Sequence, residues 1–414
     1  MKLIGPFKQI IPMTGLSLKG PIADQDLKTI ENGGILIEGQ HIKSIGKFDA
    51  LAKTVSTDTE IHELQGDHTC LPGFIDTHTH ICFAGSRAND YALRNSGKTY
   101  MEISKAGGGI WDTVTQTRKA TKEALIKGIV KRAKRHMANG VTTIEVKSGY
   151  GLSIQEELKM LYAIKEADAL LPIDLVPTCL AAHMVPKDFD GNPAEYLELI
   201  ITELLPILKA EKLTHRIDAF IEEGAFYPLL IEPYFNKAKE LGFDITVHAD
   251  QFTTGGSEVA IKYKAISADH LEASTEVEIK LLATSDVIAT ALPGASIGLG
   301  CAFAPARKIL DAGGALAIAS DHNPGSAPMG DLLTQAAILG TFEKLTNAEV
   351  LAGITSRATA ALNLSDRGQL QTGFLADMCI FHTGNYKEIL YNQGNFKPCM
   401  VWKKGELVYN KHKH

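Results

Sequence analysis

The sequence predicts an α/β fold: a (β/α)8 TIM barrel with a small β-sandwich domain formed from the N- and C-terminal segments. Two observations lead to this prediction. Eight short apolar runs alternate with helical stretches in the middle of the chain, and both ends show short alternating strands instead. Eight such units over about 290 residues fit a barrel with insertions, which typically takes about 250. We expect the barrel at residues 69–361 and the composite β domain at residues 1–68 and 362–414.

The eight apolar runs are the expected barrel strands. Each is short, and helical periodicity follows it before the next run begins. The runs are GFIDTHTH (73–80), VTTIEVK (141–147), IDLVPTCL (173–180), RIDAFIE (216–222), FDITVHAD (243–250), AISADH (265–270), DVIATAL (286–292) and ALAIASDH (315–322).

Residues 153–171 show what the expected helices look like. Ser153 is a favourable N-cap and Glu156 follows three residues later, as in a capping box. Apolar residues then recur at helical spacing on one face, at Leu158, Leu161, Ile164 and Ala167.

Both ends of the chain predict short strands. The segment GGILIEGQHIKSIG (33–46) alternates apolar and polar residues, and FLADMCIF (374–381) and PCMVWKKGELVYN (398–410) bring the pattern back near the C-terminus. Lys404-Gly405 is typical of a hairpin turn. We therefore expect the two ends to form one β domain together.

The composition excludes several classes of function. With 45% hydrophobic and 22% charged residues the chain is an ordinary globular protein, and its net charge of -6 offers no basic surface for nucleic acid. Neither a signal peptide nor a run of about 18 apolar residues is visible, which predicts a cytoplasmic protein without a membrane span. Six scattered cysteines fit a reducing compartment. A homodimer is the expected assembly.

The most informative residues stand at the ends of the expected strands, because barrel enzymes build their sites there. His78 and His80 end the first strand and lie two residues apart, so both point to one side and can bind one cation. Two surface histidines would give the same pattern. Here, however, the pair ends an apolar strand, where buried imidazoles require a partner.

Three further strands also end in residues that can bind a metal ion, namely His248, His270 and Asp321. Imidazoles with a carboxylate suit zinc or iron. The absence of paired thiolates argues against a structural zinc site and leaves room for a bound water. A metal lowers the pKa of that water towards neutrality and makes hydroxide available at pH 7.

Five segments carry a resemblance that spans the whole chain: LPGFIDTHTHICFAGSRANDY, KSGYGLS, AAHMVP, VHADQF and SDHNPGSAP. With His-x-His on strand 1, histidines on strands 5 and 6 and aspartate on strand 8, the chain resembles the amidohydrolase superfamily. Within it, the resemblance is greatest to the enzymes that open an imidazolone ring in histidine degradation. It implies hydrolysis of the small molecule 4-imidazolone-5-propanoate to N-formimidoyl-L-glutamate.

The resemblance also implies a metal site. One Zn2+ or Fe3+ ion per chain would be held by His78, His80, His248 and Asp321, while His270 would polarise the carbonyl or relay a proton. The fourth strand lacks the lysine that bridges two metals in many relatives, so a single ion is expected. Alternative ligands, for which solvated or structural roles compete, are Glu222, Glu223 and Lys147.

Six residues are expected to bind the substrate: Arg87, Tyr150, His183, Asn323, Gly325 and Ser326. The arginine suits the propanoate carboxylate, and the tyrosine and histidine suit a flat ring. The last three offer an amide, a close-approach backbone and a hydroxyl. The alternatives are a surface arginine, a packing tyrosine, a structural histidine and a tight turn. The glycine-rich stretch 105–111 is a candidate flap, or an ordinary loop.

Gln251 is kept among the catalytic residues because it stands three residues after His248, where relatives can carry a glutamate. A neutral amide cannot act as a general base, so this departure moves the proton transfer to Asp321, with His270 assisting.

Two other functions remain as alternatives. The first is a deaminase of an aminated heterocycle, which needs an acidic residue at position 251 and has no use for the carboxylate partner Arg87. The second is a barrel without metal that acts as a scaffold in an assembly. Proteins of that kind lose their ligands, whereas all four candidate ligands are present here.

Overall fold

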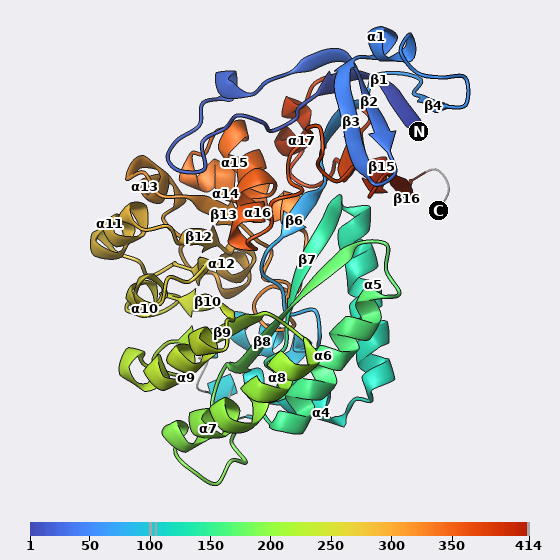
Figure 1. Ribbon diagram of the computed structural model, residues 1–414. Coiled ribbons are helices and arrows are strands. Elements are labelled where there is room, and N and C mark those ends of the chain that lie inside the picture. Colours follow the sequence, from blue (N-terminus) through green and yellow to red (C-terminus); the bar gives the residue numbers. More distant parts are fainter. Residues whose placement is uncertain (99–101, 104–105, 412–414) are drawn as a thin grey trace.

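The computed structural model describes residues 1–98, 102–103 and 106–411, whose strands form two eight-stranded sheets (Figure 1). One sheet is parallel and follows the order of the sequence. Its strands are β6 (Phe74–Asp76), β7 (Val141–Lys147), β8 (Asp174–Ala182), β9 (Arg216–Ile221), β10 (Asp244–Ala249), β11 (Ser267–His270), β12 (Ile288–Ala291) and β13 (Leu316–Ile318). The predicted (β/α)8 barrel is confirmed.

The barrel closes through the segments that carry the first and last candidate ligands. β6 and β13 stand at the two ends of the hydrogen-bonded order, and beyond them Thr79 and His322 form a parallel bridge. The backbone N–H of Asp321 donates to the carbonyl of His78 at 3.0 Å, and that of His80 donates to the carbonyl of His322 at 3.0 Å. Barrel closure therefore fixes these two segments side by side.

Each expected strand overlaps an observed one, and the run 141–147 coincides with β7, whereas β8 continues beyond the run 173–180 to Ala182. The first and last strands are shorter than the runs 73–80 and 315–322, because they end at Asp76 and Ile318. The residues beyond them turn away from a regular ladder, and Asp321 adopts a left-handed backbone with φ 51°.

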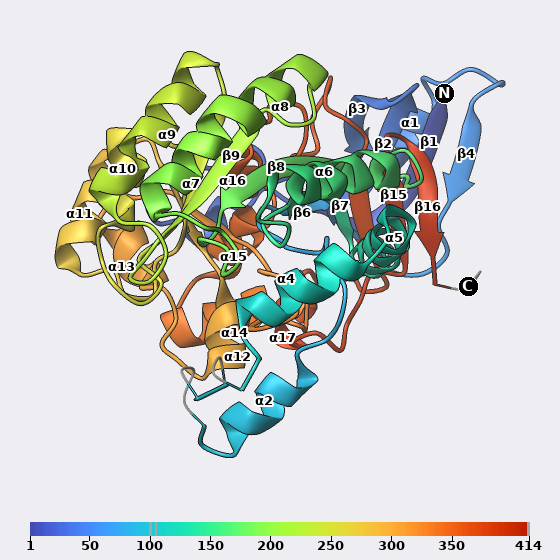
Figure 2. The same cartoon turned by 90° about the horizontal axis from the view of Figure 1, so that it is seen from below.

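Helices lie between the strands and outside them (Figures 1 and 2). They are α2 (Ala88–Asn95), α4 (Ile110–Lys119), α5 (Lys122–Ala138), α6 (Ile154–Asp168), α7 (Pro193–Leu199), the π-helical turn η2 (Ile200–Leu204), α8 (Leu205–Glu211), α9 (Pro228–Glu240), α10 (Gly256–Lys262), α11 (Glu276–Thr284), α12 (Pro293–Leu299), α13 (Ala306–Asp311), α14 (Leu332–Glu343), α15 (Asn347–Gly353) and α16 (Ser356–Ala361). Within the described residues, no helix has the length and apolar character needed to cross a bilayer.

Helix α6 begins as the sequence predicts. The Ser153 hydroxyl accepts a hydrogen bond from the backbone N–H of Glu156, and Leu161, Ile164 and Ala167 are buried. The Glu156 carboxylate forms an ion pair with Lys159. The predicted N-cap is therefore confirmed, whereas the Glu156 carboxylate pairs with Lys159 instead of completing the predicted capping box.

The second sheet joins both ends of the chain, as predicted. All its strands belong to one mixed hydrogen-bonded sheet, in which β5 pairs antiparallel with β14 and so connects the N-terminal part to the C-terminal part. Its strands are β1 (Lys2–Ile10), β2 (Ile30–Glu38), β3 (His41–Lys47), β4 (Glu60–Glu63), β5 (Thr69–Pro72), β14 (Met378–Phe381), β15 (Met400–Lys403) and β16 (Glu406–Asn410). Short helices η1 (Asp24–Asp26), α1 (Phe48–Ala52) and α17 (Lys387–Tyr391) accompany it.

The predicted hairpin turn is confirmed at Lys404 and Gly405, which have φ values of 51° and 76° and connect β15 to β16. This sheet has a core of its own, in which Phe7, Ile35 and Trp402 are buried together. The sheet is thus stabilised by its own packing as well as by its contacts with the barrel.

An ionic cluster joins this sheet to the barrel at the end where the strands begin. Asp174, the first residue of β8, accepts hydrogen bonds from Arg367 at 2.5 Å and Lys404 at 2.6 Å, and pairs with Lys403 at 2.8 Å. Lys403 also donates to Asp377 at 2.6 Å. The opposite end of the barrel, where the strands terminate, carries the candidate ligands.

Candidate metal centre and substrate site

Three histidine side chains converge at the carboxyl ends of β6 and β10. Nε2 of His80 lies 3.2 Å from Nε2 of His78 and 3.3 Å from Nε2 of His248, and all three rings are buried. Nitrogen ligands about 2.0–2.1 Å from a tetrahedral zinc stand about 3.3 Å apart. The three nitrogens thus have the spacing of ligands around one ion, and the cluster can bind a metal.

Asp321 lies beside this cluster. Its Oδ1 is 3.5 Å from Nε2 of His80 and 3.7 Å from Nε2 of His78. Its Oδ2 accepts hydrogen bonds from the Asn323 amide at 2.8 Å and the Ser326 hydroxyl at 3.4 Å. One carboxylate oxygen is thus held by the following loop, while the other faces the histidines. Burial raises the pKa of Asp321 to about 6.

Two buried carboxylates orient the histidine rings, and sequence reasoning missed both. Asp269 on β11 lies 2.7 Å from Nδ1 of His78, and Asp218 on β9 lies 2.9 Å from Nδ1 of His248. A carboxylate at Nδ1 fixes the tautomer that leaves the Nε2 lone pair for a metal. The available signal was an aspartate within an apolar strand, in RIDAFI and in SADH. A barrel strand accepts such a residue only where it has a partner.

Burial also keeps the three rings neutral. It lowers the pKa of His248 to about 4 and holds the pKa values of His78 and His80 well below their ordinary range. The Lys147 charge and the neighbouring rings act in the same direction at His78 and His80. Neutral imidazole is the form that binds metal, so the rings are ready as ligands at pH 7.

His270 lies beside the cluster at the end of β11. Its ring centre is 5.4 Å from that of His248 and 5.8 Å from that of His78. Burial lowers its pKa, but the Glu272 carboxylate, 3.3 Å from Nδ1, together with Asp321 and Asp269, outweighs burial and raises it. With φ 90° the His270 backbone is strained, as is common at functional sites. The ring therefore stands next to the proposed ligands in a form that favours proton donation.

Tyr150 and His183 line the same end of the barrel. The His183 ring stacks on the His80 ring at 5.8 Å and 22°, and the Tyr150 ring lies 5.8 Å from His80. Nδ1 of His183 contacts the carbonyl of Gly149 at 2.9 Å, which leaves Nε2 for another partner. Burial raises the pKa of the Tyr150 hydroxyl, which stays a hydrogen-bond donor at neutral pH. The two rings and His80 form one aromatic wall.

Arg87 reaches the loop after Asp321, although more than 230 residues separate them in sequence. A Cβ atom added to Gly325 would lie 2.5 Å from Nη1 of Arg87, so the guanidinium packs on that glycine. Nε of Arg87 donates to Asp90 at 2.6 Å, and the same Asp90 oxygen accepts the N–H of Gly109 at 2.9 Å. Only the part of the predicted flap from residue 106 onward belongs to the described residues; Lys105 lies outside them.

The loop 323–326 is held by its own polar groups. The Asn323 carbonyl oxygen accepts the N–H groups of Gly325 at 2.7 Å and Ser326 at 2.8 Å, and its amide donates to the Ser326 hydroxyl at 2.9 Å. The tight turn, which is the alternative to a substrate-binding role for this loop, is therefore present. The same turn brings Ser326 next to Asp321, so structural and binding roles are compatible here.

The remaining candidates occupy different surroundings. Gln251 follows β10 and is half-buried, while Glu223 is exposed. The Glu222 carboxylate accepts the N–H of Phe252 at 2.9 Å and so holds the turn after β10. The Lys147 ammonium is buried among carboxylates. The side chains of Glu222 and Lys147 are thus bound to other protein groups. These contacts fit the structural alternative to a metal-ligand role.

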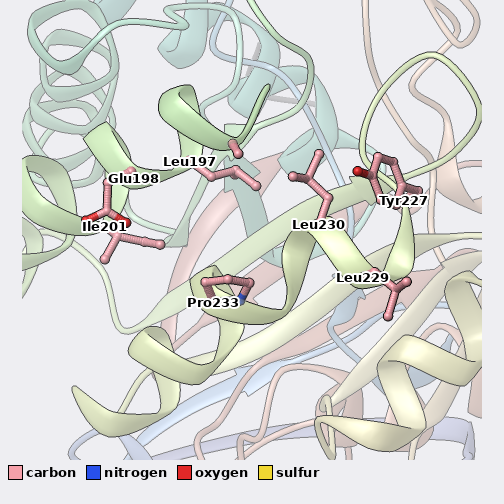
Figure 3. A pocket seen from close by; sticks show the side chains of 8 residues that line it. Leu197, Glu198, Ile201, Tyr227, Leu229, Leu230 and Pro233 are labelled. Carbon is pink, nitrogen blue, oxygen red and sulfur yellow. The ribbon is translucent and has the colours of Figure 1, made fainter. Parts of the chain in front are cut away.

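A separate groove lies on the outer face of the barrel, between α7 with η2 and α9 (Figure 3). Most of its lining is apolar, and it includes the exposed side chain of Leu229. The lining residues are Ala194, Leu197, Glu198, Ile201, Tyr227, Leu229, Leu230 and Pro233. The candidate ligands and substrate residues are not among them, so the groove is distinct from the histidine site.

Comparison with known proteins places this geometry in a family. The model of the amidohydrolase family matches residues 69–408, which include every strand of the barrel and all the candidate ligands. The chain belongs to the amidohydrolase family. Its three clustered histidines and the strand-8 aspartate therefore stand in a protein of a family of hydrolases.

Curated relatives place this amidohydrolase more narrowly. It is 40% identical to an imidazolonepropionase of Alkaliphilus oremlandii over 94% of this chain and 92% of the relative. It is 37% identical to an imidazolonepropionase of a Geobacillus strain, over 97% and 96% of the two chains. At this identity and coverage the chain belongs with the imidazolonepropionases inside the amidohydrolase family.

Solved structures agree on the fold. An adenosine deaminase of Xanthomonas campestris with bound zinc superimposes with a TM-score of 0.73 at 16% identity, covering 99% of this chain and 93% of the other. An atrazine chlorohydrolase of Arthrobacter aurescens complexed with zinc gives a TM-score of 0.70 at 16% identity, covering 99% and 95%. At such identities the likeness shows that this amidohydrolase shares their fold.

Proposed function

We propose that this amidohydrolase hydrolyses 4-imidazolone-5-propanoate to N-formimidoyl-L-glutamate, a step of histidine degradation. The observation that carries the proposal is the 37–40% identity to imidazolonepropionases over more than nine-tenths of the chain. In this reaction water adds to the carbonyl carbon of the ring amide and the carbon–nitrogen bond breaks. The leaving nitrogen takes a proton, so one water is consumed and a single product forms.

One Zn2+ or Fe3+ ion would be held by His78, His80, His248 and Asp321. The spacing of the three Nε2 atoms and the carboxylates at the Nδ1 atoms support this ligand set. When bound, the ion lowers the pKa of a water molecule and supplies a nucleophile at neutral pH.

The carboxylate of Asp321 and the imidazole of His270 carry out the proton transfers. Asp321 takes a proton from the attacking water, because its Oδ1 faces the cluster and burial raises its pKa, which makes the carboxylate a stronger base. His270, whose pKa is raised by Glu272, polarises the carbonyl and passes a proton to the leaving nitrogen. Gln251 cannot exchange protons and is proposed to contact the reacting group through its amide.

The substrate would lie against the aromatic wall with its carboxylate at Arg87. The fork of the guanidinium suits a carboxylate, and the guanidinium packs on Gly325 in the loop that follows Asp321. Tyr150 and His183 hold the flat ring, and Asn323, Gly325 and Ser326 shape the loop beside it.

The test is the ultraviolet absorbance of freshly prepared 4-imidazolone-5-propanoate mixed with protein of known metal content. We expect the ring chromophore to disappear with wild type and to persist with His78→Ala. Persistence with metal-loaded wild type contradicts the substrate assignment. Release of ammonia from aminated heterocycles by the same preparation would instead support the deaminase, and absence of bound metal would support the scaffold.

A second experiment examines the carboxylate partner. Arg87→Met should raise KM at least tenfold while kcat changes less, because the arginine binds a group remote from the reacting carbonyl. The matched control is Arg94→Met, which removes a partly exposed arginine of α2, the helix that Arg87 precedes. An unchanged KM in Arg87→Met contradicts the proposed orientation of the substrate.

A further inference from the structure

We propose that Lys147 is a positioning residue that fixes the metal-binding histidines through the carboxylates behind them. This inference rests on the metal site of the proposed function. Lys147 is the last residue of β7, and it forms ion pairs with Glu145, Asp218 and Asp269 rather than with the four proposed ligands. Its effect on the site passes through two aspartates and one backbone segment.

The first two connections run to the ring-orienting aspartates. Nζ of Lys147 lies 2.8 Å from Oδ2 of Asp218, the same oxygen that is 2.9 Å from Nδ1 of His248. It also lies 3.9 Å from Oδ2 of Asp269, the oxygen that is 2.7 Å from Nδ1 of His78. One ammonium group thus faces both carboxylate oxygens that set the two histidine rings.

The third connection reaches the backbone between the first two ligands. The N–H of Lys147 donates to the carbonyl of Thr79 at 2.9 Å. Its ion-pair partner Glu145, 2.7 Å from Nζ, accepts the N–H of Thr79 at 3.3 Å. The Thr79 hydroxyl donates to the carbonyl of Glu145 at 2.6 Å. The residue between His78 and His80 is therefore held on both sides by β7.

Charge explains why a cation is needed at this place. Asp218, Asp269 and Glu145 are all buried, and the three carboxylates would repel one another without a positive charge between them. Lys147 is fully buried with them. Removing the ammonium would let the aspartates move apart, and each movement would turn a histidine ring away from the common centre.

A second buried lysine provides the matched control. Lys403 is 1% exposed and pairs with Asp377 at 2.6 Å and Asp174 at 2.8 Å, at the other end of the barrel. Lys147→Met and Lys403→Met therefore remove the same group from similar surroundings, and only the first removes a connection to the histidines.

The experiment measures zinc and cobalt affinity by competition with a chelator, together with the visible spectrum of the cobalt form. We expect zinc binding to weaken about 10- to 100-fold in Lys147→Met, the range for losing a group that orients a ligand. The cobalt bands should shift in the same variant. Lys403→Met should bind both metals as wild type does.

Each result of this experiment either supports or overturns the positioning role of Lys147. Wild-type affinity and an unchanged cobalt spectrum in Lys147→Met overturn the inference, while failure of wild type to bind metal overturns the metal site and the inference with it. Equal weakening in Lys403→Met also overturns it, because the effect would then reflect general destabilisation. If Lys147→Met does not fold, Lys147→Gln takes its place, because the glutamine amide keeps one donor for Asp218. We expect Lys147→Gln to bind zinc about tenfold more weakly than wild type. A zinc affinity within twofold of wild type overturns the inference.

Discussion

Two buried lysines at opposite ends of the barrel both pair with carboxylates, but they have different roles. Lys147 pairs with Glu145 and Asp218 where the strands terminate, and Lys403 pairs with Asp377 where the strands begin. The difference lies in what their carboxylate partners touch next. Asp218 continues to a histidine ring, whereas Asp377 accepts the backbone N–H of Lys404 in a hairpin turn.

This comparison shows that burial and ion pairing alone do not distinguish a metal-binding site from a cluster that only holds two parts of the fold together. Asp174 connects β8 of the barrel with Lys403 and Lys404 of the terminal sheet, so its cluster holds two sheets together. Asp218 and Asp269 bring their charges to imidazoles that share one centre. We therefore expect changes in the first cluster to alter stability and changes in the second to alter metal binding.

The largest effect should come from removing a ligand. His248→Ala should lower kcat about 10³-fold or more, equivalent to about 4 kcal/mol, because the metal-activated water is lost. The measurement is the rate of loss of the imidazolone chromophore together with metal content. His215→Ala is the control, because His215 is exposed and directly precedes β9, at the end of the barrel away from the candidate ligands. Retention of both metal and rate in His248→Ala would refute the ligand set.

The second largest effect should come from breaking the ionic cluster around Lys403, which joins the terminal sheet to the barrel. Lys403→Met leaves Asp377 and Asp174 without their buried cation and should lower the free energy of unfolding by about 3 kcal/mol. Urea denaturation measures this change, with the chelator competition beside it. If the variant keeps its stability but loses metal, the assignment of the two clusters is reversed.

Removing one ring-orienting charge should have a smaller effect on metal binding. Asp218→Asn should weaken zinc affinity about 10- to 100-fold, or about 1.4–2.7 kcal/mol, because the amide no longer fixes the His248 tautomer. Asp377→Asn is the paired variant at the other cluster and should bind zinc normally. Equal affinities in the two variants would remove the distinction between the clusters.

The smallest effect concerns acid stability. Burial alone would raise the pKa of Asp174, but Lys403, Lys404 and Arg367 outweigh burial and hold it below its ordinary value. A depressed carboxyl pKa stabilises the fold above the unfolded value of about 4, and this stability is lost as pH falls further. Asp174→Asn should therefore lose less unfolding free energy than wild type between pH 5 and pH 3 in urea titrations. A parallel decline in the two proteins would contradict the pKa argument.

Local patterns in the sequence were sufficient for most of the fold. Each barrel strand is a short apolar run that needs no distant residue to be recognised, and the Lys404-Gly405 turn follows from two adjacent residues. Strand boundaries were less accurate at β6 and β13, where the chain leaves the ladder to form the barrel mouth. The sequence at the ends of these two strands carries no local signal that shows where the chain leaves the sheet.

The sequence by itself determined which residues stand at the strand ends, since His78, His80, His248 and Asp321 each follow a recognisable apolar run. Only the tertiary structure decided which charges stand behind them. His78 meets Asp269 across 191 positions, and Lys147 on β7 reaches Asp218 on β9, although β8 stands between these strands in the sheet. Such contacts depend on barrel closure and strand register, which a window of neighbouring residues does not encode.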